Sequence, residues 1–340
     1  MCIQLRRLGD ILLTTPAISY LKKQYPQASI DYLSEPIGKL ALQKNPNLND
    51  VLIYDSKNPI GEIKRIRSKK YDVIFDFMGN PRTAVLSRLS SAKLRVGFPH
   101  HARSFFYNLK PVKAKKPEYN GLRKVRLIQA WLNKLGQPTP EPMFIRPQLF
   151  LTDEDEKYAQ EWIKEQNMGS SPFVVLAPAS RIPTRRWGPD GFRDLGLDLY
   201  RKMNIKVYYA WGPSEEGLIQ SIRDGYENEL KMLPATNIRQ MAAIIKRAQF
   251  VVSLDSGVMH IAVAMNTSTV TIYGPTRPID WNPSLTDEAP TVQNEIVQVQ
   301  NLDCLGCHLN ECPIGHYCMK RLSKDDVFRF CEQILVKEAK

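Results

Sequence analysis

The fold is decided by the stretch from residue 250 to residue 273, which reads FVVSLDSGVMHIAVAMNTSTVTIY. Residues 250–253 and 269–273 are short apolar runs rich in β-branched side chains, a pattern typical of buried strands. Between them, residues 259–265 are apolar and follow a turn of small residues, which favours a short helix. A strand, a helix and a second strand in this order predict part of a parallel sheet.

The same alternation continues outward from this stretch. Further strands are predicted at residues 3–5, 29–33, 51–54, 71–76, 173–177 and 206–210. Further helices are predicted at residues 12–24, 61–70, 122–135, 151–166, 189–203, 215–225 and 238–247. Alternating strands and helices predict an α/β protein whose mostly parallel sheets carry helices on their faces.

A Pro-rich segment at residues 138–142 interrupts the alternation, so we expect an inter-domain linker within 136–171. The predicted domains are residues 1–150 and 171–325, followed by a C-terminal helix at 326–340. Each half resembles a nucleotide-binding unit, and we expect a cleft between two lobes.

Bulk composition is that of an ordinary globular protein. The 340 residues are 43% hydrophobic, 24% charged and 9% aromatic, which argues against a disordered or fibrous chain. No run of 18 apolar residues occurs, and Arg6 and Arg7 break the short apolar start. Neither a spanning helix nor a secretory signal is predicted, and we expect a cytoplasmic protein.

The chain is basic, with 47 Lys and Arg against 35 Asp and Glu and a net charge of +12. This balance favours an anionic partner such as nucleic acid, an acidic membrane or a phosphorylated substrate. The basic residues are dense in the poorly patterned stretch 99–126, and loops of this length are often functional; a solvated surface loop is the alternative. Nucleic-acid binding would require a basic recognition helix or aromatic-rich basic strands. The sequence contains neither, so no nucleic-acid partner is expected.

The turn after residues 250–253 has side chains suited to a nucleotide sugar. Open α/β sheets bind ligands beyond the carboxyl ends of their strands, and the free N–H groups at a helix start bind phosphate. Ser256 adds a hydroxyl donor, Gly257 lets an anion approach the backbone, and His260 adds a donor or a charge. Asp255 disfavours phosphate, so its natural partner is a sugar hydroxyl. The alternative is a structural helix cap with a core histidine.

Two further turns also follow predicted strands. In the first, Ser180 precedes Arg185 and Arg186, and Arg pairs with phosphate oxygens through two bonds, so this turn is suited to a diphosphate. The alternative is a surface basic pair packed over Trp187. In the second, Glu215 is suited to ribose hydroxyls, although acids also favour helix N-termini.

Gly9 and Asp10 follow the first strand, in a predicted turn. A carboxylate at a strand end can act as a general base; in isolation, a Gly-Asp turn with Asp capping the next helix is the alternative. No Gly-x-Gly-x-x-Gly follows this strand and no Walker motif occurs, which argues against a standard NAD enzyme or P-loop NTPase.

Four cysteines cluster near the C-terminus, at Cys304, Cys307, Cys312 and Cys318. Four thiolates this close in sequence can hold a structural Zn²⁺ or an iron–sulfur cluster. We expect a structural metal site without a catalytic role; free thiols in a loop are the alternative.

Five motifs in chain order resemble the ADP-heptose:lipopolysaccharide heptosyltransferases of glycosyltransferase family 9. They are LGDILLTTPA at 8–17, DFMGNPR at 76–82, DSGVMH at 255–260, YGPT at 273–276, and the cysteine cluster with LSKDDV at 322–327. The resemblance spans nearly the whole chain. It implies the GT-B fold, with two Rossmann-like lobes facing a central cleft, and inverting transfer of a heptose without a cofactor in the chemistry.

The resemblance also implies roles for single residues. Asp10 takes the place of the family's general base, in a lobe that binds the acceptor. The implied donor ligands in the other lobe are Ser180, Arg185, Glu215, Asp255, Ser256, Gly257 and His260. Among these, Asp255 contacts the sugar, and Ser256 and Gly257 bind the diphosphate. Arg185 stands where the family has Lys, and Arg is bulkier and less of a point charge.

The implied acceptor is the phosphorylated lipid A–Kdo inner core of lipopolysaccharide, at the cytoplasmic face of the inner membrane. Its negative charge gives the basic balance an explanation, and we expect peripheral membrane contact. The expected acceptor contacts are Arg82, Arg103, Lys110 and Lys113. The alternatives are a GT-B transferase with another nucleotide sugar or acceptor, and a non-catalytic paralogue that binds sugar nucleotides.

Overall fold

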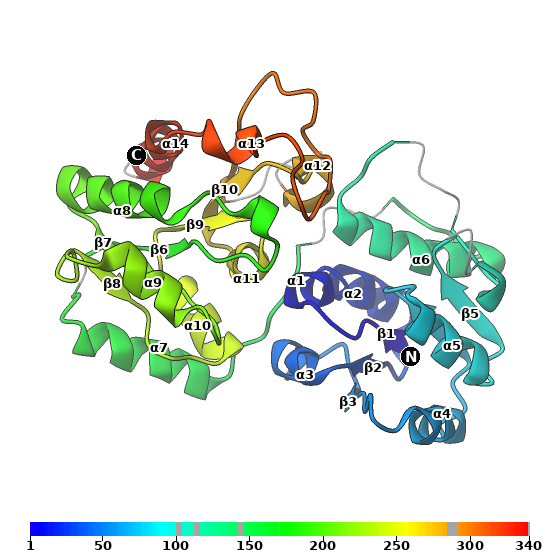
Figure 1. Ribbon diagram of the computed structural model, residues 1–340. Helices are drawn as coiled ribbons and strands as arrows, with labels where there is room; N and C mark the ends of the chain where they lie inside the picture. The colour runs from blue at the N-terminus through cyan, green and yellow to red at the C-terminus, as the bar shows by residue number, and fades with distance from the viewer. Residues whose placement is uncertain (100–103, 112–115, 142–145, 170, 284–291, 339–340) are drawn as a thin grey trace. The chain divides into compact units, whose positions relative to one another are not determined.

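The structure is a computed structural model that describes residues 1–99, 104–111, 116–141, 146–169, 171–283 and 292–338. Contacts within the chain divide it into two compact units, Met1–Phe150 and Leu151–Lys340. The first contains a five-stranded sheet and the second a six-stranded sheet (Figure 1), and all the paired strands are parallel. The predicted α/β class with parallel sheets is therefore confirmed.

The first sheet has the order β3-β2-β1-β4-β5. Its strands are β1 (Cys2–Ile3), β2 (Asp31–Ser34), β3 (Asp50–Ile53), β4 (Val73–Asp76) and β5 (Leu94–Gly97). Its helices are α1 (Leu8–Leu12), α2 (Thr15–Gln24), α3 (Pro36–Leu42), α4 (Pro59–Ser68), α5 (Pro81–Leu89), the 3₁₀ helix η1 (Ser104–Phe106) and α6 (Asn120–Lys134). The strand order reverses at β1, which has β2 on one side and β4 on the other. Open α/β sheets bind ligands at such a reversal.

The second sheet has the order β11-β10-β9-β6-β7-β8, so its reversal lies between β6 and β9. Its strands are β6 (Phe173–Ala177), β7 (Lys206–Tyr209), β8 (Leu230–Met232), β9 (Phe250–Leu254), β10 (Ser268–Tyr273) and β11 (Asn294–Gln298). Its helices are α7 (Asp153–Glu165), η2 (Pro183–Arg185), α8 (Pro189–Met203), α9 (Glu216–Arg223), α10 (Ile238–Ile245), α11 (Gly257–Ala264), α12 (Pro278–Trp281), α13 (Tyr317–Lys320) and α14 (Lys324–Glu338). No helix in the described ranges is long and apolar enough to cross a membrane.

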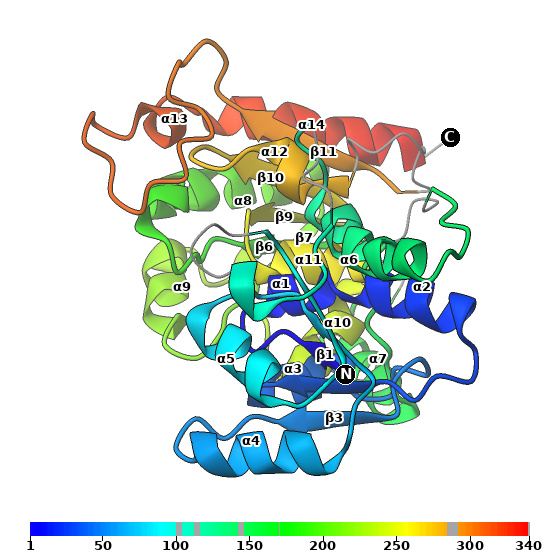
Figure 2. The same cartoon turned by 90° about the vertical axis from the view of Figure 1, so that its right-hand side faces the viewer.

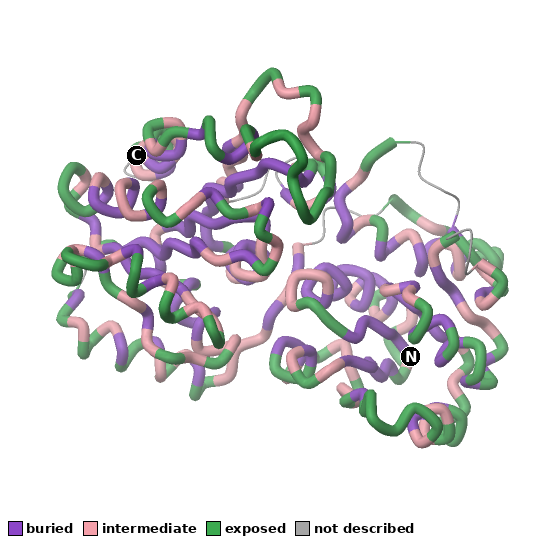
Figure 3. Tube along the Cα trace, viewed as in Figure 1, coloured by how far each residue is buried: buried purple, intermediate pink, exposed green. Residues whose placement is uncertain are grey.

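The central strands of the second sheet are buried along their whole length (Figure 3): every residue of β6, β9 and β10 is buried. Parallel strands covered on both faces read as continuous apolar runs, which is why the sequence predicts them. On one face, Val252 and Ile272 share a core cluster with Phe192 of α8 and Ile334 of α14. Helix α14 packs against α8, β10 and β11 (Figure 2).

Some sequence predictions differ from the structure. Gly9 and Asp10 lie inside α1 rather than in a turn, because the chain turns at Arg7, whose φ of 71° is left-handed, and the helix begins directly afterwards. The long unpatterned stretch is shorter than predicted, since α6 already begins at Asn120. The edge strands β5 and β11 are missed because about half of their residues are only partly buried, which interrupts the apolar pattern.

Helix α7, within the predicted range 151–166, begins with a capping box at Thr152. Its hydroxyl oxygen accepts a hydrogen bond from the Asp155 N–H at 3.3 Å, and the Asp155 carboxylate accepts one from the Thr152 N–H at 2.9 Å. Arg239 of α10 lies 3.1 Å from the same carboxylate. We expect Thr152→Ala to lower the free energy of unfolding by about 1 kcal/mol. Urea unfolding checks this, with the exposed Ser56→Ala as control; equal midpoints for both variants would contradict it.

Candidate active site

The turns after β6 and β9 lie at the same sheet edge, because the two strands are parallel neighbours. Arg185 comes from η2, after β6, and Asp255 follows β9 directly. The Arg185 Nη1 lies 2.9 Å from the Asp255 carboxylate and donates to the Asp255 carbonyl oxygen at 3.2 Å. Asp255 is buried and Arg185 is about three-quarters buried. The ion pair compensates the charge of Asp255 and fixes the first turn to the second.

Helix α11 begins at this ion pair. Ser256 is its N-cap, with an extended backbone (φ −146°, ψ 175°), and Gly257 is its first residue. The Ser256 hydroxyl makes no capping hydrogen bond. The first N–H groups of a helix have no partner within it, so this turn offers backbone donors and one hydroxyl to a ligand.

Several buried polar atoms near this helix have no hydrogen-bond partner in the part of the chain that the structure describes. Four of them are Ser256 Oγ, His260 Nδ1, Thr276 Oγ1 and Trp281 Nε1. Thr276 follows β10, the neighbour of β9, and the rings of His260 and Trp281 lie 6.1 Å apart. Each buried unpaired polar group costs about 1–3 kcal/mol. Such groups at one sheet edge indicate a site that a polar ligand completes.

His260 is buried, and its charge state follows from its surroundings. Burial, and then the positive charge of Arg185, lower the pKa of His260 to about 3. The imidazole is therefore neutral at physiological pH. Of the two contributions predicted from the sequence, a hydrogen bond and a charge, only the hydrogen bond is open to it.

The two arginines of the turn after β6 have different partners: Arg185 contacts Asp255, and Arg186 contacts its own turn. Arg186 Nε donates to the carbonyl oxygen of Ser180 at 2.8 Å, so it closes its own turn. Ser180 is buried, and its Oγ accepts from the Ile182 N–H at 3.3 Å. Trp187 is buried and donates to the Leu322 carbonyl at 3.0 Å, as the structural alternative predicts. The predicted contact of both guanidinium groups with one diphosphate stays a prediction.

Glu215 follows β7, the strand next to β6. It occupies the N-cap of α9, and its carboxylate accepts the Gly212 N–H at 2.8 Å. This contact is the structural alternative given for Glu215 above, an acid that favours a helix N-terminus. The neighbouring Glu216 is exposed and accepts a hydrogen bond from Gln220 at 3.3 Å.

In the first unit, Asp10 lies in the first turn of α1, next to the reversal at β1. It is half-buried and lines a pocket of about 140 Å³. The other lining residues are Gln4, Arg6, Arg7, Phe77, Met78 and Lys124. The parallel pairing of β1 with β4 thus brings the first motif to the DFMGNPR motif.

The predicted acceptor residues are only partly described. Arg103 and Lys113 lie outside the described residues. Arg82 lies 3.7 Å from the carboxylate of Glu35. Lys110 is exposed, so it meets the requirement for contact with a large anionic partner.

The cysteine cluster has unequal surroundings. Cys318 is buried, Cys304 is half-buried, and Cys307 and Cys312 are exposed, all as free thiols. Burial, and then the other three thiols, raise the pKa of Cys318 to about 11. Across the described ranges, no three His, Cys, Asp or Glu side chains form a group that could hold a metal.

The loop that carries these cysteines contacts the turns after β6 and β10. The His308 N–H donates to the Pro275 carbonyl at 2.7 Å, and the Thr184 hydroxyl donates to the Leu309 carbonyl at 2.7 Å. Thr184 precedes Arg185, so the loop supports the turn that carries this arginine. Spacing in the sequence did not predict this role.

Three residues of these sites have no role predicted from the sequence: Thr276, Trp281 and Lys124. Thr276 belongs to the YGPT motif but received no role. Lys124 had a usable signal: it stands in the apolar stripe of α6, with Leu127 and Ile128, where a charged residue is unusual. Trp281 had no such signal in the sequence, because its contact with His260 depends on the fold.

Comparison with known proteins identifies the family of this chain. The profile of glycosyltransferase family 9 (heptosyltransferase) matches residues 62–318. The chain is 27% identical over 290 residues to lipopolysaccharide heptosyltransferase 3 of Escherichia coli, covering 81% of this chain and 83% of that one.

Solved structures show the same fold. A family 9 glycosyltransferase from Veillonella parvula DSM 2008 superposes with a TM-score of 0.82 at 19% identity, covering 99% of this chain and 96% of that one. The E. coli ADP-heptose lps heptosyltransferase II gives a TM-score of 0.77 at 19% identity, covering 100% and 99%. The GT-B fold class expected from the resemblance is confirmed. The profile match covers most of the chain, and the protein therefore belongs to glycosyltransferase family 9, the heptosyltransferases.

Proposed function

We propose that this heptosyltransferase moves a heptose from ADP-heptose to the inner core of lipopolysaccharide, with inversion at the anomeric carbon. The proposal that the chain binds a sugar donor rests on one observation. Within the described residues, a set of buried polar atoms near the start of α11 has no hydrogen-bond partner. A sugar with its diphosphate supplies hydroxyl and phosphate partners for such atoms. The name of the E. coli relative, a lipopolysaccharide heptosyltransferase, supports the acceptor half.

In the proposed reaction, the oxygen of an acceptor hydroxyl forms a bond to the anomeric carbon as the bond from that carbon to the diphosphate oxygen breaks. Asp10 takes the hydroxyl proton as general base. ADP leaves with the electron pair of the broken bond. A single displacement from the opposite face inverts the configuration, and no step requires a cofactor.

The donor ligands are assigned by their chemistry. The first N–H groups of α11 and the Ser256 hydroxyl bind the diphosphate, aided by Gly257 and the helix dipole. Asp255 accepts from a sugar hydroxyl, while Arg185, held beside it at 2.9 Å, stabilises the charge that grows on the leaving group. His260 contributes a neutral hydrogen bond.

The nucleoside and the remaining diphosphate contacts are assigned to the neighbouring turns. Glu215 binds ribose hydroxyls, and Ser180 lines the diphosphate. Both turns leave the carboxyl ends of β6 and β7, which are paired in the sheet. Arg185 in place of the family's Lys keeps the positive charge but spreads it over a planar group.

On the acceptor side, the net charge of +12 suits a phosphorylated lipid A–Kdo acceptor at an anionic membrane surface. We assign the acceptor contacts to Arg82, Arg103, Lys110 and Lys113. We expect the enzyme to act at the cytoplasmic face of the inner membrane.

A structural metal at the four cysteines is proposed separately and takes no part in the transfer. The side chains as they stand in the described residues do not form such a group, so no step depends on it. Elemental analysis of the purified protein decides between bound zinc or iron and four free thiols.

Asp10→Asn keeps the shape of the side chain but removes its basicity. We expect kcat to fall by a factor of about 100 to 10,000 with an unchanged Kd for ADP-heptose, measured by product formation and by calorimetry. The exposed Asp72→Asn serves as control and should transfer normally. Unaltered transfer by Asp10→Asn would remove Asp10 as the base; no transfer by the wild type would favour the non-catalytic alternative.

Ser256→Ala and Asp255→Asn should weaken donor binding in different ways. Loss of the Ser256 hydroxyl affects the diphosphate, so the affinities for ADP and ADP-heptose should both fall by about tenfold or more. Asp255→Asn should weaken the binding of ADP-heptose but not of ADP. It removes the carboxylate that accepts a hydrogen bond from a hydroxyl of the donor sugar, and it releases Arg185 to bind phosphate. Titration calorimetry checks both, with the exposed Ser221→Ala as control. Equal losses of ADP and ADP-heptose affinity in Asp255→Asn would contradict the assignment.

The neutrality of His260 predicts a flat pH response. A histidine with an ordinary pKa near 6.5 loses its charge as the pH rises through that value, and phosphate affinity falls with it. Because the pKa of His260 is lowered to about 3, the Kd for ADP-heptose should stay constant from about pH 5.5 to about pH 8. A several-fold weakening in the wild type that His260→Gln abolishes would show that the cation binds the donor.

A further inference from the structure

A lysine is buried in the wall of the Asp10 pocket. Lys124 is 8% exposed, and its ammonium donates hydrogen bonds to the Phe77 carbonyl at 2.5 Å and to the Gln4 side chain at 3.4 Å. Both of these partners are neutral. Lysine is almost never so buried unless its charge is compensated, and the reaction proposed above assigns Lys124 no task.

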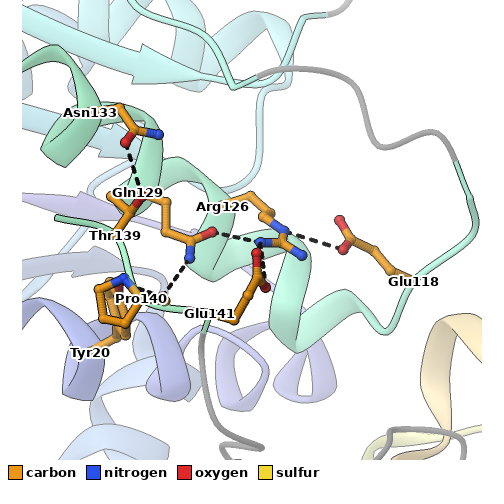
Figure 4. A network of polar contacts seen from close by, with 8 residues as sticks. All are labelled: Tyr20, Glu118, Arg126, Gln129, Asn133, Thr139, Pro140 and Glu141. Carbon is orange, nitrogen blue, oxygen red and sulfur yellow. Dashed lines mark hydrogen bonds and ion pairs between the residues drawn. The ribbon is translucent and has the colours of Figure 1, made fainter.

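Helix α6 holds this lysine in place. The Arg126 guanidinium, two residues further on, lies 3.4 Å from Glu118 and 3.0 Å from Glu141, and it donates to Gln129 at 2.9 Å (Figure 4). The helix also packs along α2. The position of Lys124 is therefore set by an anchored helix.

Positive charge exceeds negative charge in the lining of this pocket. The basic residues of the lining are Arg6, Arg7 and Lys124. Asp10 is the acidic residue among the lining residues. The other acid near Lys124, Asp76, has its own partners: it accepts from the Tyr107 hydroxyl at 2.6 Å and from two backbone N–H groups at 3.0 and 2.9 Å. A polar pocket with this balance favours an anion.

We propose that this pocket binds an acidic group, a carboxylate or a phosphate, that the acceptor carries beside its reacting hydroxyl. A volume of about 140 Å³ has room for a group of a few water-sized atoms. Lys124 supplies a fixed charge in the wall, and Arg7, at the start of α1, offers a guanidinium that suits planar acidic groups. That the acidic group lies beside the reacting hydroxyl rests on the proposed role of Asp10 as the base. That the pocket binds an anion does not rest on it.

The charge of Lys124 gives this site a pH dependence. Burial lowers the pKa of Lys124 to about 8; Asp10 and Asp76 oppose the shift, and Arg123 adds to it. The ammonium is charged below this pH and neutral above it, while Arg6 and Arg7 stay charged throughout. Affinity for an acidic group should therefore fall as the pH rises through about 8.

The test is titration calorimetry of the full chain with three probes: the sugar acid Kdo, its methyl ester, and inorganic phosphate. The proteins are the wild type, Lys124→Met, and Lys134→Met, which removes an exposed lysine of the same helix. Near neutral pH, Lys124→Met should bind the acid probes at least about tenfold more weakly than the other two proteins. All three proteins should bind the ester alike. Tighter binding of Kdo identifies a carboxylate site, and tighter binding of phosphate identifies a phosphate site.

Equal affinity of Lys124→Met and wild type for both acid probes overturns the proposal. Equal affinity of the wild type for Kdo and its ester, together with no binding of phosphate, overturns it as well. If Lys124→Met does not fold, the wild type alone decides. Its affinity for Kdo should fall several-fold between about pH 7 and about pH 9 while the ester is unaffected; a flat response overturns the site. A failure of heptosyl transfer counts against the proposed function but leaves these binding results intact.

Discussion

The ion pair between Arg185 and Asp255 is the interaction on which the candidate donor site depends. The two residues are far apart in the chain, and they meet because β6 and β9 are parallel neighbours at the point where the sheet order reverses. Parallel pairing places the carboxyl ends of both strands at one edge, as in other open α/β sheets. The pair compensates a buried carboxylate and holds the start of α11 beside the turn after β6. Burial, and then the charge of the same arginine, lower the pKa of His260 to about 3 and so keep it neutral.

The same constraint organises the first unit. Strand β1 lies between β2 and β4, so the residues after β1 and after β4 share one sheet edge. Asp10, Phe77 and Lys124 consequently line one pocket, although they belong to three different segments of the chain. The pocket of this unit thus contains a carboxylate that is suited to accept a proton. It also contains fixed positive charge that is suited to bind an anion. Each unit is completed by a polar ligand in the proposed reaction.

The architecture could be predicted from the sequence because buried parallel strands leave continuous apolar runs. Strand β6 and helix α8 have their predicted bounds, whereas the edge strands β5 and β11 were missed, since their partly exposed residues break the pattern. At the site, motif resemblance selected Asp255 and Arg185 but not their contact. The use of Arg186 within its own turn and the contact of Trp281 with His260 both depend on tertiary packing. Local spacing carries no information about such long-range partners.

This family 9 enzyme is proposed to use ADP-heptose on an inner-core acceptor. Mass spectrometry of products from ADP-heptose and a set of truncated lipopolysaccharide acceptors tests it most directly, with NMR of the new linkage to read its configuration. We expect one heptose to be added to an acidic inner-core acceptor, with the anomeric configuration opposite to that of the donor. Transfer from a UDP- or GDP-sugar in place of ADP-heptose, or retention of configuration, would contradict it.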